Sequence, residues 1–574
     1  MKKIAFIFSF LLLSSFVGAQ NGSKQKADKL FEKKAYVEAA AIYKALEPTK
    51  DILQNLGDCY YFNSEMESAV KAYTQLFSKY KDNLDKVVYF RFGHALMGIK
   101  DYERSDQIMT EYLGTAVNTN EFIDRLSKVL PYEYELKRMS NSASTGDFGI
   151  TFYGEKVVFA SLRNKEGKQY HWNNQPYLDL FEATVTEEDV LENIKPFSEE
   201  INTKTHESNA TFSSDGKTMY FSRTNKKRVK IEDKKVATVK IFKAQYIDSI
   251  WTKVEEMPFS SDLYSTQHPV LNKENTRLYF ASDMPGSVGS FDIYYVDILE
   301  EGYGEPVNLG SVVNTKHREQ FPFIAPDSTL YFASDGHQGF GGLDVFMTRP
   351  SEGVYIAPLN LGETLNSSKD DFGYILKEED QKGYVSSNRE GQDNLYSVKR
   401  KESNVEYLVE GKVIDKTTKE LLPETLVTLY DEDGNLIGEM TVGEDATYSF
   451  NVSPNKTYKI EGKRDFYVPS TQEFTTNELG KTEYDIELEI VSYDVAEEVV
   501  VTREDGRQYI ELENIYFDLD KWDIKPQAAQ QLDLLVELMQ KYPNMQVQLG
   551  AHTDSRSSSM YNLRLSQNRA DAAL

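Results

Sequence analysis

The groups near the C-terminus that could bind a charged ligand are the carboxylate of Asp554 and the guanidinium of Arg569. A carboxylate only accepts hydrogen bonds, and a guanidinium donates them in a planar fork, so the two groups suit opposite charges. Thr553 and Asn562 are close to them in the sequence and can add neutral hydrogen bonds. The alternative is that Asp554 and Arg569 form only a surface ion pair, worth under about 1 kcal/mol.

Two strands are expected to lead into this region. The run Ile-Tyr-Phe-Asp at 515–518 is expected to end the first strand. Val547 and Leu549 alternate with two glutamines, which predicts a half-buried second strand. This strand would deliver Thr553 and Asp554 at its end.

Two helices are expected to complete the region. The first should begin at Pro526, because proline is accepted in the first turn of a helix. Its apolar face should consist of Ala528, Leu532, Leu535 and Met539. The second should begin near Ser559, and Asn562, Leu565 and Arg569 then fall on one face of it.

Two linked motifs resemble the OmpA C-terminal (OmpA/MotB/Pal) family: Phe517-Asp518 to Ile524, and the run from His552 to Ala570. In that family an aspartate after the strand and an arginine of the helix hold the ammonium and carboxylate of diaminopimelate in peptidoglycan. By position these are Asp554 and Arg569, with Thr553 and Asn562 adding hydrogen bonds. The resemblance therefore implies peptidoglycan as a partner.

The resemblance has two departures. Ser557 stands where the family usually has glycine, and the chain ends at Leu574 inside the second helix, before the family's remaining strands. We therefore expect residues 509–574 to be an OmpA-like domain that is incomplete at its C-terminal end. Residues 491–508 are expected to be a linker, with an added strand within Val491 to Arg507 as the alternative.

The N-terminus has the pattern of a signal peptide, expected at residues 1–19. Two lysines precede an apolar run from Ile4 to Leu13, and Val-Gly-Ala at 17–19 fits a cleavage site. The apolar run is shorter than the roughly 20 residues that span a bilayer, so no transmembrane segment is expected. Gln20 and Asn21 follow where a lipoprotein has its cysteine, so no acyl anchor is expected.

Composition limits the remaining classes. At 574 residues, several domains are expected. The net charge of −26 argues against nucleic-acid binding, which needs a concentrated basic face. A single cysteine, Cys59, excludes an intramolecular disulfide. No cofactor and no metal site is expected.

Residues 20–140 contain an internal repeat. Its members are Ala27, Leu30, Ala39 and Tyr43, then Gly57, Tyr60, Ala69 and Tyr73, then Gly93, Leu96, Ser105 and Met109. Small residues would let paired helices approach closely, and the pattern resembles the tetratricopeptide repeat. Such a stack either presents a concave surface to a partner or acts as a spacer; we favour partner binding.

Residues 141–402 contain five strand-like runs of the type Tyr-Phe-Ala-Ser. Their central residues are Phe159, Phe221, Phe280, Phe332 and Val385, separated by 62, 59, 52 and 53 residues. A four-stranded propeller blade has about this length. The segment resembles the WD40-like repeats of the TolB family, which implies a β-propeller of five blades, or six if one has diverged.

Two features of this segment carry further expectations. The triplets Asp-Phe-Gly at 147–149 and 371–373 look like equivalent strand starts, and we expect them to close the ring. Acids and glycines at 283–292, 335–344 and 388–394 suit either calcium or tight turns. We favour turns, because Gly, Asn and Asp tolerate positive φ.

Residues 403–490 alternate strand-like runs with turn signals such as Asp433-Gly434. This segment resembles a carboxypeptidase regulatory-like β-sandwich, which is a structural companion rather than a catalyst. The predicted fold class is thus multidomain: all-α helical repeats, a β-propeller, a β-sandwich and a truncated α/β OmpA-like domain.

This order of segments resembles envelope proteins of the Bacteroidetes, including the PorE-like proteins of type IX secretion. It implies a non-catalytic protein at the periplasmic face of the outer membrane, which links an outer-membrane or periplasmic assembly to peptidoglycan. The repeats and the propeller would be its protein-binding modules.

Two alternatives stay open. One is a pure periplasmic scaffold of a secretion or gliding apparatus, which never binds the wall. The other is a propeller-associated hydrolase, although the sequence contains neither a GxSxG elbow nor an HExxH helix.

Overall fold

The protein is described here by a computed structural model of the chain, which divides into two units, Met1–Ser403 and Asn404–Leu574. The residues described are 22–141, 146–164, 169–170, 172, 174–231, 234–351, 353–403, 407–454, 456–465, 467–476, 481–490, 499–513, 515–542 and 545–574. The predicted signal peptide and the first part of the predicted linker, 491–498, lie outside them. In the described residues no helix is both long enough and apolar enough to cross a membrane.

The first unit begins with helices, as predicted. Residues 22–32 are helical and are followed by α2 (Tyr36–Tyr43), α3 (Lys50–Phe62), α4 (Met66–Tyr80), a short 3-10 turn η1 (Lys81–Asn83), α5 (Lys86–Met97), α6 (Tyr102–Leu113) and α7 (Thr119–Val129). Helices α3 and α4 pack together, as do α5 and α6.

The small repeat residues allow these helices to approach closely. A Cβ atom at Gly57 would lie 2.5 Å from Cε1 of Tyr73. The Tyr73 hydroxyl donates to Asp58 Oδ1 at 2.6 Å, and the equivalent Tyr43 hydroxyl donates to Asp28 Oδ1 at 2.7 Å. The 30-residue repeat therefore preserves a tyrosine–aspartate hydrogen bond as well as the small residue.

Replacing Gly57 by valine should lower the free energy of unfolding by about 2 kcal/mol, because the fully buried Tyr73 ring must move to admit the side chain. Urea denaturation measures this change. Gly22→Val is the matched control, since nothing lies within 4 Å of a Cβ atom there. Equal effects of the two substitutions would show that close approach of α3 and α4 is not the cause.

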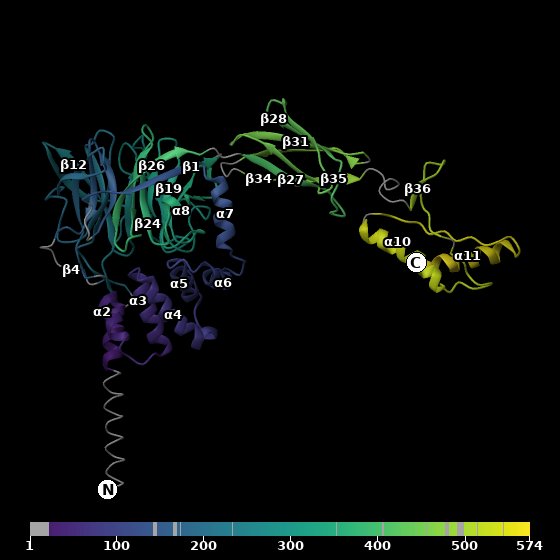
Figure 1. Cartoon of the computed structure of the whole chain (residues 1–574), viewed down its shortest axis with the longest axis horizontal. Coiled ribbons are helices and arrows are strands. Elements are labelled where there is room, and N and C mark those ends of the chain that lie inside the picture. Colours follow the sequence, from purple (N-terminus) through teal and green to yellow (C-terminus); the bar gives the residue numbers. More distant parts are fainter. Residues whose placement is uncertain are drawn as a thin grey trace, which may run out of the picture. The chain divides into compact units, whose positions relative to one another are not determined.

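Five four-stranded antiparallel sheets follow (Figure 1). Their strands are β2 (Asp147–Tyr153), β3 (Lys156–Ser161), β6 (Asp179–Val185) and β7 (Leu191–Pro196); β8 (Glu207–Phe212), β9 (Thr218–Thr224), β12 (Val239–Ile247) and β13 (Ile250–Glu256); β14 (Thr266–Leu271), β15 (Arg277–Ser282), β16 (Asp292–Asp297) and β17 (Val307–Asn308); β18 (Glu319–Ile324), β19 (Leu330–Ser334), β20 (Asp344–Thr348) and β23 (Leu359–Asn360); β24 (Asp371–Lys377), β25 (Lys382–Ser387), β26 (Asn394–Glu402) and β1 (Tyr132–Arg138). Strands β2, β8, β14, β18 and β24 contact one another in a closed cycle. The five sheets therefore form a ring of blades.

The sequence landmarks lie in the second strand of each blade. Phe159, Phe221, Phe280, Phe332 and Val385 are at most 1% exposed. Short hairpins leave the blades at β4 (Gln169–Tyr170) with β5 (Gln175–Pro176), at β10 (Val229–Ile231) with β11 (Lys234–Val236), and at β21 (Pro350–Ser351) with β22 (Val354–Tyr355). A single-turn helix, α8 (Gly362–Leu365), precedes the fifth blade.

The prediction for ring closure was confirmed in part, because the strands that begin with the two triplets contact each other, with the Phe148 and Phe372 ring centroids 5.8 Å apart. The triplets at 147–149 and 371–373 do begin equivalent strands, β2 and β24, but the last blade is completed by β1, which pairs antiparallel with β26. Figure 1 shows β1 beside β26. Residues 132–138 thus belong to the ring and not to the helical segment, so the boundary expected at 140 lies too late. The strand's partner is more than 250 residues away, and local sequence carries no signal for it.

Every inner strand has a left-handed residue at its third position. These residues are Gly149, Asn209, His268, Phe321 and Gly373, with φ of 65°, 34°, 56°, 52° and 63°. Each sits at a register shift in the pairing of its strand. All five line a cavity of about 210 Å³. The bulges therefore turn one residue per blade toward a common space, where His268 stacks on Phe321 with ring centroids 3.7 Å apart.

Buried acids hold the blade turns. Asp292 accepts hydrogen bonds from the N–H groups of Val288 at 2.6 Å and Gly289 at 3.0 Å, and Asp344 accepts one from Phe340 at 2.7 Å. This is the geometry of the turn interpretation, in which the carboxylate binds the loop's own backbone.

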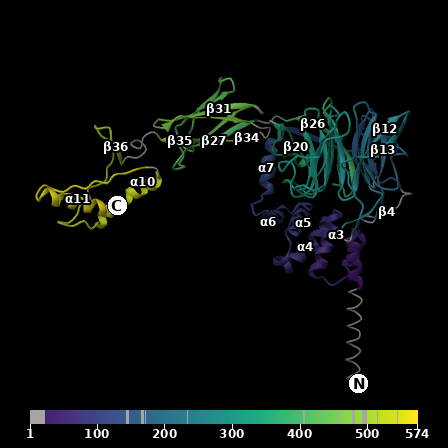
Figure 2. The ribbon, with the colours of Figure 1, turned by 180° about the vertical axis from the view of Figure 1, so that it is seen from behind.

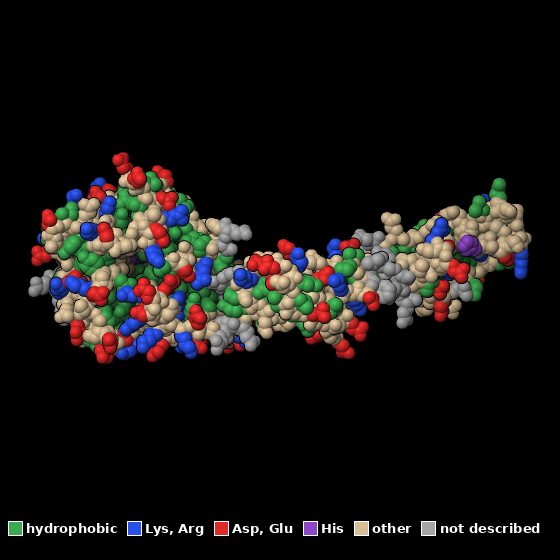
Figure 3. Space-filling model, turned by 90° about the horizontal axis from the view of Figure 1, so that it is seen from above, with side chains coloured by type: hydrophobic (Ala, Val, Ile, Leu, Met, Phe, Trp, Pro, Cys, Tyr) green, Lys and Arg blue, Asp and Glu red, His purple; other side chains and the backbone are tan. Residues whose placement is uncertain are grey.

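The helices cover one end of the ring. Phe90 of α5 stacks on His317 of a blade loop at 3.5 Å between ring centroids, and the Tyr112 hydroxyl lies 2.9 Å from His317 Nε2. Both ribbon views place α3 to α6 against this end (Figures 1 and 2). Figure 3 looks onto the opposite end, where acidic and basic side chains alternate over the surface. Part of the helical stack thus faces the chain's own blades.

The second unit begins with two packed sheets. One contains β30 (Thr447–Asn451), β27 (Leu408–Asp415), β35 (Ile486–Ile490), β32 (Tyr467–Val468) and β34 (Lys481–Glu483); the other contains β29 (Leu436–Thr441), β28 (Leu426–Asp431), β31 (Thr457–Lys463) and β33 (Ser470–Thr475). Val409, Val427, Leu429 and Leu488 form the centre of a shared core and are fully buried. Asp431 accepts a hydrogen bond from the N–H of Asn435 at 2.7 Å, which closes the turn at 431–435.

The C-terminal segment contains two hairpin strands, β36 (Val500–Thr502) and β37 (Gln508–Ile510), and two helices, α10 (Pro526–Lys541) and α11 (Ser559–Ala573). Strand β36 lies in the second half of the predicted linker and β37 begins at its last residue, and Val500 packs against Leu538 and Tyr542. Of the two expectations for this stretch, the added strand is confirmed at residues 500–502, and the apolar contact of Val500 ties them to α10.

Candidate functional site

The helices of the predicted site form where expected, and the strands do not. Helix α10 begins at Pro526, and α11 begins at Ser559, where the Ser558 hydroxyl accepts a hydrogen bond from the N–H of Tyr561. The segments 515–518 and 546–549 are not strands, and neither pairs with another described segment. A strand depends on hydrogen bonds to a neighbour, so alternation alone could not decide these segments.

The buried face of α10 also differs from the prediction. Ala528, Leu535 and Leu538 are buried, whereas Met539 is 42% exposed. Leu538 takes the inner position because it packs against Val500 of the β36–β37 hairpin.

Asp554 lies exposed in the loop before α11. One carboxylate oxygen accepts a hydrogen bond from the N–H of Arg556 at 3.1 Å, and the other lies 3.5 Å from Arg556 Nε. The carboxylate side chain is 67% exposed and that of Arg556 is 90% exposed. This exposed contact leaves Asp554 able to accept hydrogen bonds from a ligand.

Asn562 holds that loop in place. Its side-chain N–H groups donate to the carbonyl oxygen of Asp554 at 2.8 Å and to that of Ser557 at 3.4 Å. The residue is therefore committed, through its amide nitrogen, to the loop that presents Asp554. Thr553, the other predicted neutral group, directly precedes Asp554 and is half-buried.

Arg569 is fixed from the other side. Its guanidinium donates to the carbonyl of Lys521 at 3.0 Å and to that of Asp518 at 3.2 Å, and it lies 4.9 Å above the ring of Phe517. In the described part of the chain Asp554 and Arg569 form no ion pair with each other. The acceptor, Asp554, and the donor, Arg569, are thus held by different parts of the segment.

The motif at 517–524 was singled out in the sequence, but no contact with α11 was predicted for the loop 518–525. The Tyr561 hydroxyl donates to Asp520 Oδ1 at 2.9 Å, which joins α11 to this loop. Lys525 Nζ lies 2.5 Å from Asp518, and this hydrogen bond holds the pKa of the Asp518 carboxyl below its usual range. The signal available in the sequence was the charge pattern Asp-Leu-Asp-Lys at 518–521.

A broad cavity of about 1420 Å³ lies beside these groups. Phe517, Ala551, His552 and Arg569 are among the residues that line it. Arg569 therefore borders an open space large enough for part of a polymer as well as a small ligand.

Comparison with known proteins identifies this segment. Residues 516–574 match the model of the OmpA family. Over 58 residues the chain is 40% identical to outer membrane porin F of Pseudomonas fluorescens, which is 10% of this chain and 18% of that protein. Over 60 residues it is 38% identical to the peptidoglycan-associated lipoprotein of Brucella melitensis, 10% of this chain and 36% of that protein. The chain thus spans well under half the length of these relatives.

Solved structures resemble the chain in fold alone. TolB from Acinetobacter baumannii is 13% identical, and the match covers 55% of this chain and 70% of that one with a TM-score of 0.26. A putative TolB from Agrobacterium tumefaciens is also 13% identical and covers 56% of this chain and 99% of that one, with a TM-score of 0.28.

Proposed function

We propose that the OmpA-family domain at residues 516–574 binds peptidoglycan, and that the protein is a non-catalytic component of the bacterial envelope. The observation that carries this proposal is the family match together with its relative, a peptidoglycan-associated lipoprotein. The location that follows is the periplasm, at the inner face of the outer membrane.

Asp554 and Arg569 are the residues proposed to hold diaminopimelate. The exposed Asp554 carboxylate would accept hydrogen bonds from the ligand's ammonium, and Arg569 would donate to its carboxylate. Asn562 supports this recognition by fixing the loop of Asp554, and the carbonyls of Asp518 and Lys521 orient Arg569. Thr553 would contribute a further hydrogen bond.

The remaining segments are proposed to bind proteins. The helices would act as tetratricopeptide-like repeats, the blades as a TolB-like propeller, and the two packed sheets as a carboxypeptidase regulatory-like spacer. The protein would thereby link an outer-membrane or periplasmic assembly to the wall, in the manner of the PorE-like proteins of type IX secretion or gliding.

Alanine at Asp554 or Arg569 should reduce co-sedimentation with purified diaminopimelate-containing sacculi by about tenfold to a hundredfold, since each removes a charged hydrogen bond worth roughly 1.5–3 kcal/mol. The measurement uses the full-length protein over a range of sacculus concentrations. Sacculi that carry lysine in place of diaminopimelate should bind weakly, because they lack the carboxylate that Arg569 would hold.

Asp571→Ala is the matched control, because Asp571 is an exposed carboxylate on the same helix and bonds only to Gln567 among the described residues. Asp554→Asn tests charge at constant shape and should behave like the alanine variant. If Asp554→Ala sediments as well as Asp571→Ala, the wall is not the partner, and the scaffold alternative replaces this proposal.

A further inference from the structure

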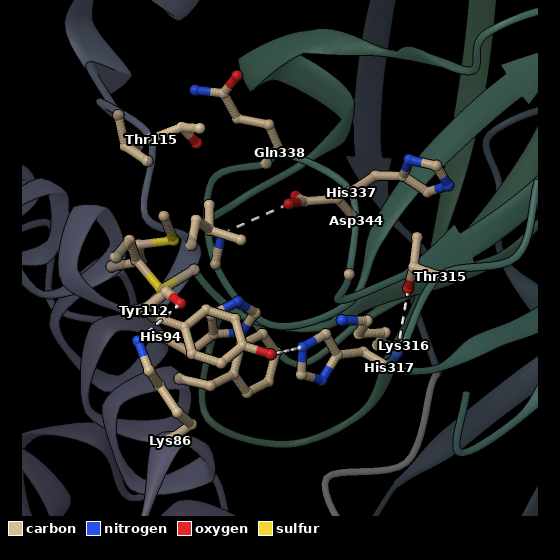
Figure 4. A pocket seen from close by; sticks show the side chains of 18 of the residues that line it. Lys86, His94, Tyr112, Thr115, Thr315, Lys316, His317, His337, Gln338 and Asp344 are labelled. Atoms are coloured by element: carbon tan, nitrogen blue, oxygen red, sulfur yellow. Dashed lines mark hydrogen bonds between the residues drawn. The ribbon is translucent and has the colours of Figure 1, made fainter. Parts of the chain in front are cut away.

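A cavity of about 700 Å³ lies in the first unit, between the helices and the blade loops. Its helical wall includes Phe90, Met97 and Met109, and its blade wall includes His317 and Gln338. Figure 4 shows Lys86 and Tyr112 approaching from the helices, Thr115 from the segment after α6, and Lys316, His317, His337 and Gln338 from the blade loops. Ligand pockets in proteins commonly have volumes of roughly 300–1,000 Å³.

The two walls are fixed to each other. The Phe90 and His317 rings are nearly parallel, with 6° between their planes, and the Tyr112 hydroxyl bonds to His317 at 2.9 Å (Figure 4). Ser64 of the α3–α4 turn and Asp370 of the last blade add a hydrogen bond at 3.3 Å. The cavity is therefore already formed in the folded chain, so a ligand would not have to order it.

The polar groups of the lining are mostly occupied within the protein. Hydrogen bonds join Thr315 to Glu319, His337 to the carbonyl of Val313, Lys86 to the carbonyl of Glu111, and Tyr112 to His317. Nδ1 of His94 and Oδ1 of Asp344 are the buried lining atoms that lack a partner in the described residues. A bound peptide would bury many N–H and C=O groups against this wall without partners, which disfavours a peptide ligand.

The rest of the lining suits an alkyl chain. Met97 and Met109 have flexible, polarizable side chains that adapt to irregular apolar ligands. Leu113 also borders the cavity and is 55% exposed. An apolar guest would remove this surface from water.

Lys316 places a positive charge at the rim of the cavity. Lys316 is exposed and lines the cavity, and among the described residues no carboxylate lies within ion-pair distance of its ammonium group. In a protein of net charge −26, a lysine left without a carboxylate beside an apolar cavity favours an anionic head group.

We propose that this cavity binds an amphiphile, with its alkyl chain between the methionines and its anionic head at Lys316. The shared chemistry is a single unbranched chain with a carboxylate or phosphate, which a free fatty acid or a single-chain phospholipid would supply. The site does not depend on wall binding by the C-terminal domain.

Calorimetric titration of the full-length protein with dodecanoate, below its micelle concentration, should show saturable binding. Lys316→Glu should weaken it about tenfold or more, the effect of one charge-assisted hydrogen bond, but should leave 1-dodecanol binding little changed. Ala116→Trp, at an exposed lining position, should abolish binding of both probes. Lys273→Glu is the control for a change of charge at another exposed lysine of the ring.

Titration with lysophosphatidylglycerol distinguishes the two possible ligands, a free fatty acid and a single-chain phospholipid. Tighter binding of this lipid than of dodecanoate assigns a phospholipid, and the reverse assigns a fatty acid. Failure of dodecanoate and of the lipid to bind, or equal binding by Ala116→Trp, overturns the proposal. Sedimentation of Ala116→Trp with sacculi should match that of the parent, so the outcome here is distinct from that of the wall-binding test.

Discussion

Replacing Arg223 by alanine should lower the free energy of unfolding by about 3–5 kcal/mol, because it leaves the carboxylate of Glu207 buried without its cationic partner. Arg223 Nε lies 2.9 Å from Glu207 Oε1, and the two side chains are 7% and 0% exposed. Burial raises the pKa of Glu207 and lowers that of Arg223, as expected where ionised groups lose their hydration. Chemical denaturation, followed by tryptophan fluorescence, measures the loss.

A double substitution separates the unpaired charge from the lost contacts. Glu207→Leu with Arg223→Met removes both charges and keeps apolar volume, and should recover most of the stability, since buried ion pairs can be replaced by apolar residues at little cost. Arg223 also donates to the carbonyl of Ile201 at 2.6 Å, so recovery should be incomplete. If Arg223→Ala lowers the free energy of unfolding by less than about 1 kcal/mol, the prediction is wrong. The buried pair would then contribute no more than an exposed pair such as Lys128–Asp124.

Glu319 should make the protein less stable as the pH rises from about 4.5 to about 7. Burial raises the pKa of this fully buried carboxyl from 4.5 to about 7, although hydrogen bonds from Thr315 and Ser334 oppose the shift. A raised folded pKa means that the folded chain holds the proton more tightly than the unfolded chain. The contribution is thus fully present below pH 4.5 and is lost by about pH 7, at roughly 3 kcal/mol in all.

Comparing the parent with Glu319→Gln isolates the contribution of Glu319 to the pH dependence of stability. Asp344 and Asp371 also have raised pKa values from burial, so the parent's pH dependence contains several contributions of the same sign. Glutamine does not titrate. Between pH 4 and pH 8 the free energy of unfolding should therefore fall by about 3 kcal/mol less in the variant than in the parent. Identical slopes would show that burial does not raise the pKa of Glu319 above its value in the unfolded chain.

The site illustrates what residue spacing could and could not establish. Helical spacing placed Asn562, Leu565 and Arg569 on α11, and Leu565 is buried as that face requires. It could not show that Asn562 holds the loop of Asp554, or that Arg569 is oriented by the carbonyls of Asp518 and Lys521, because these bonds cross between segments. The roles of Asp554, Arg569, Thr553 and Asn562 in ligand binding stay predictions.

In the ring of blades, too, some features followed from the sequence and one did not. Repetition in the sequence located the second strand of each blade, because a fully buried strand needs a continuous apolar run there. The blade turns also follow from local residues, since Asp292 and Asp344 bind the backbone within four residues of themselves. The closing strand β1 was missed, because its pairing with β26 has no local trace.

By itself, the sequence determined the elements whose signals are local: the helices with small residues at a fixed spacing, the repeated blade strands and the start of each C-terminal helix. Only the tertiary structure decided which strand closes the ring, which face of α10 is buried, and how the helices meet the blades to enclose a cavity beside His317. The physical reason is that periodicity and turn chemistry act over a few residues. Closure, burial and enclosure depend on contacts between residues far apart in the chain, whose partners no short stretch of sequence specifies.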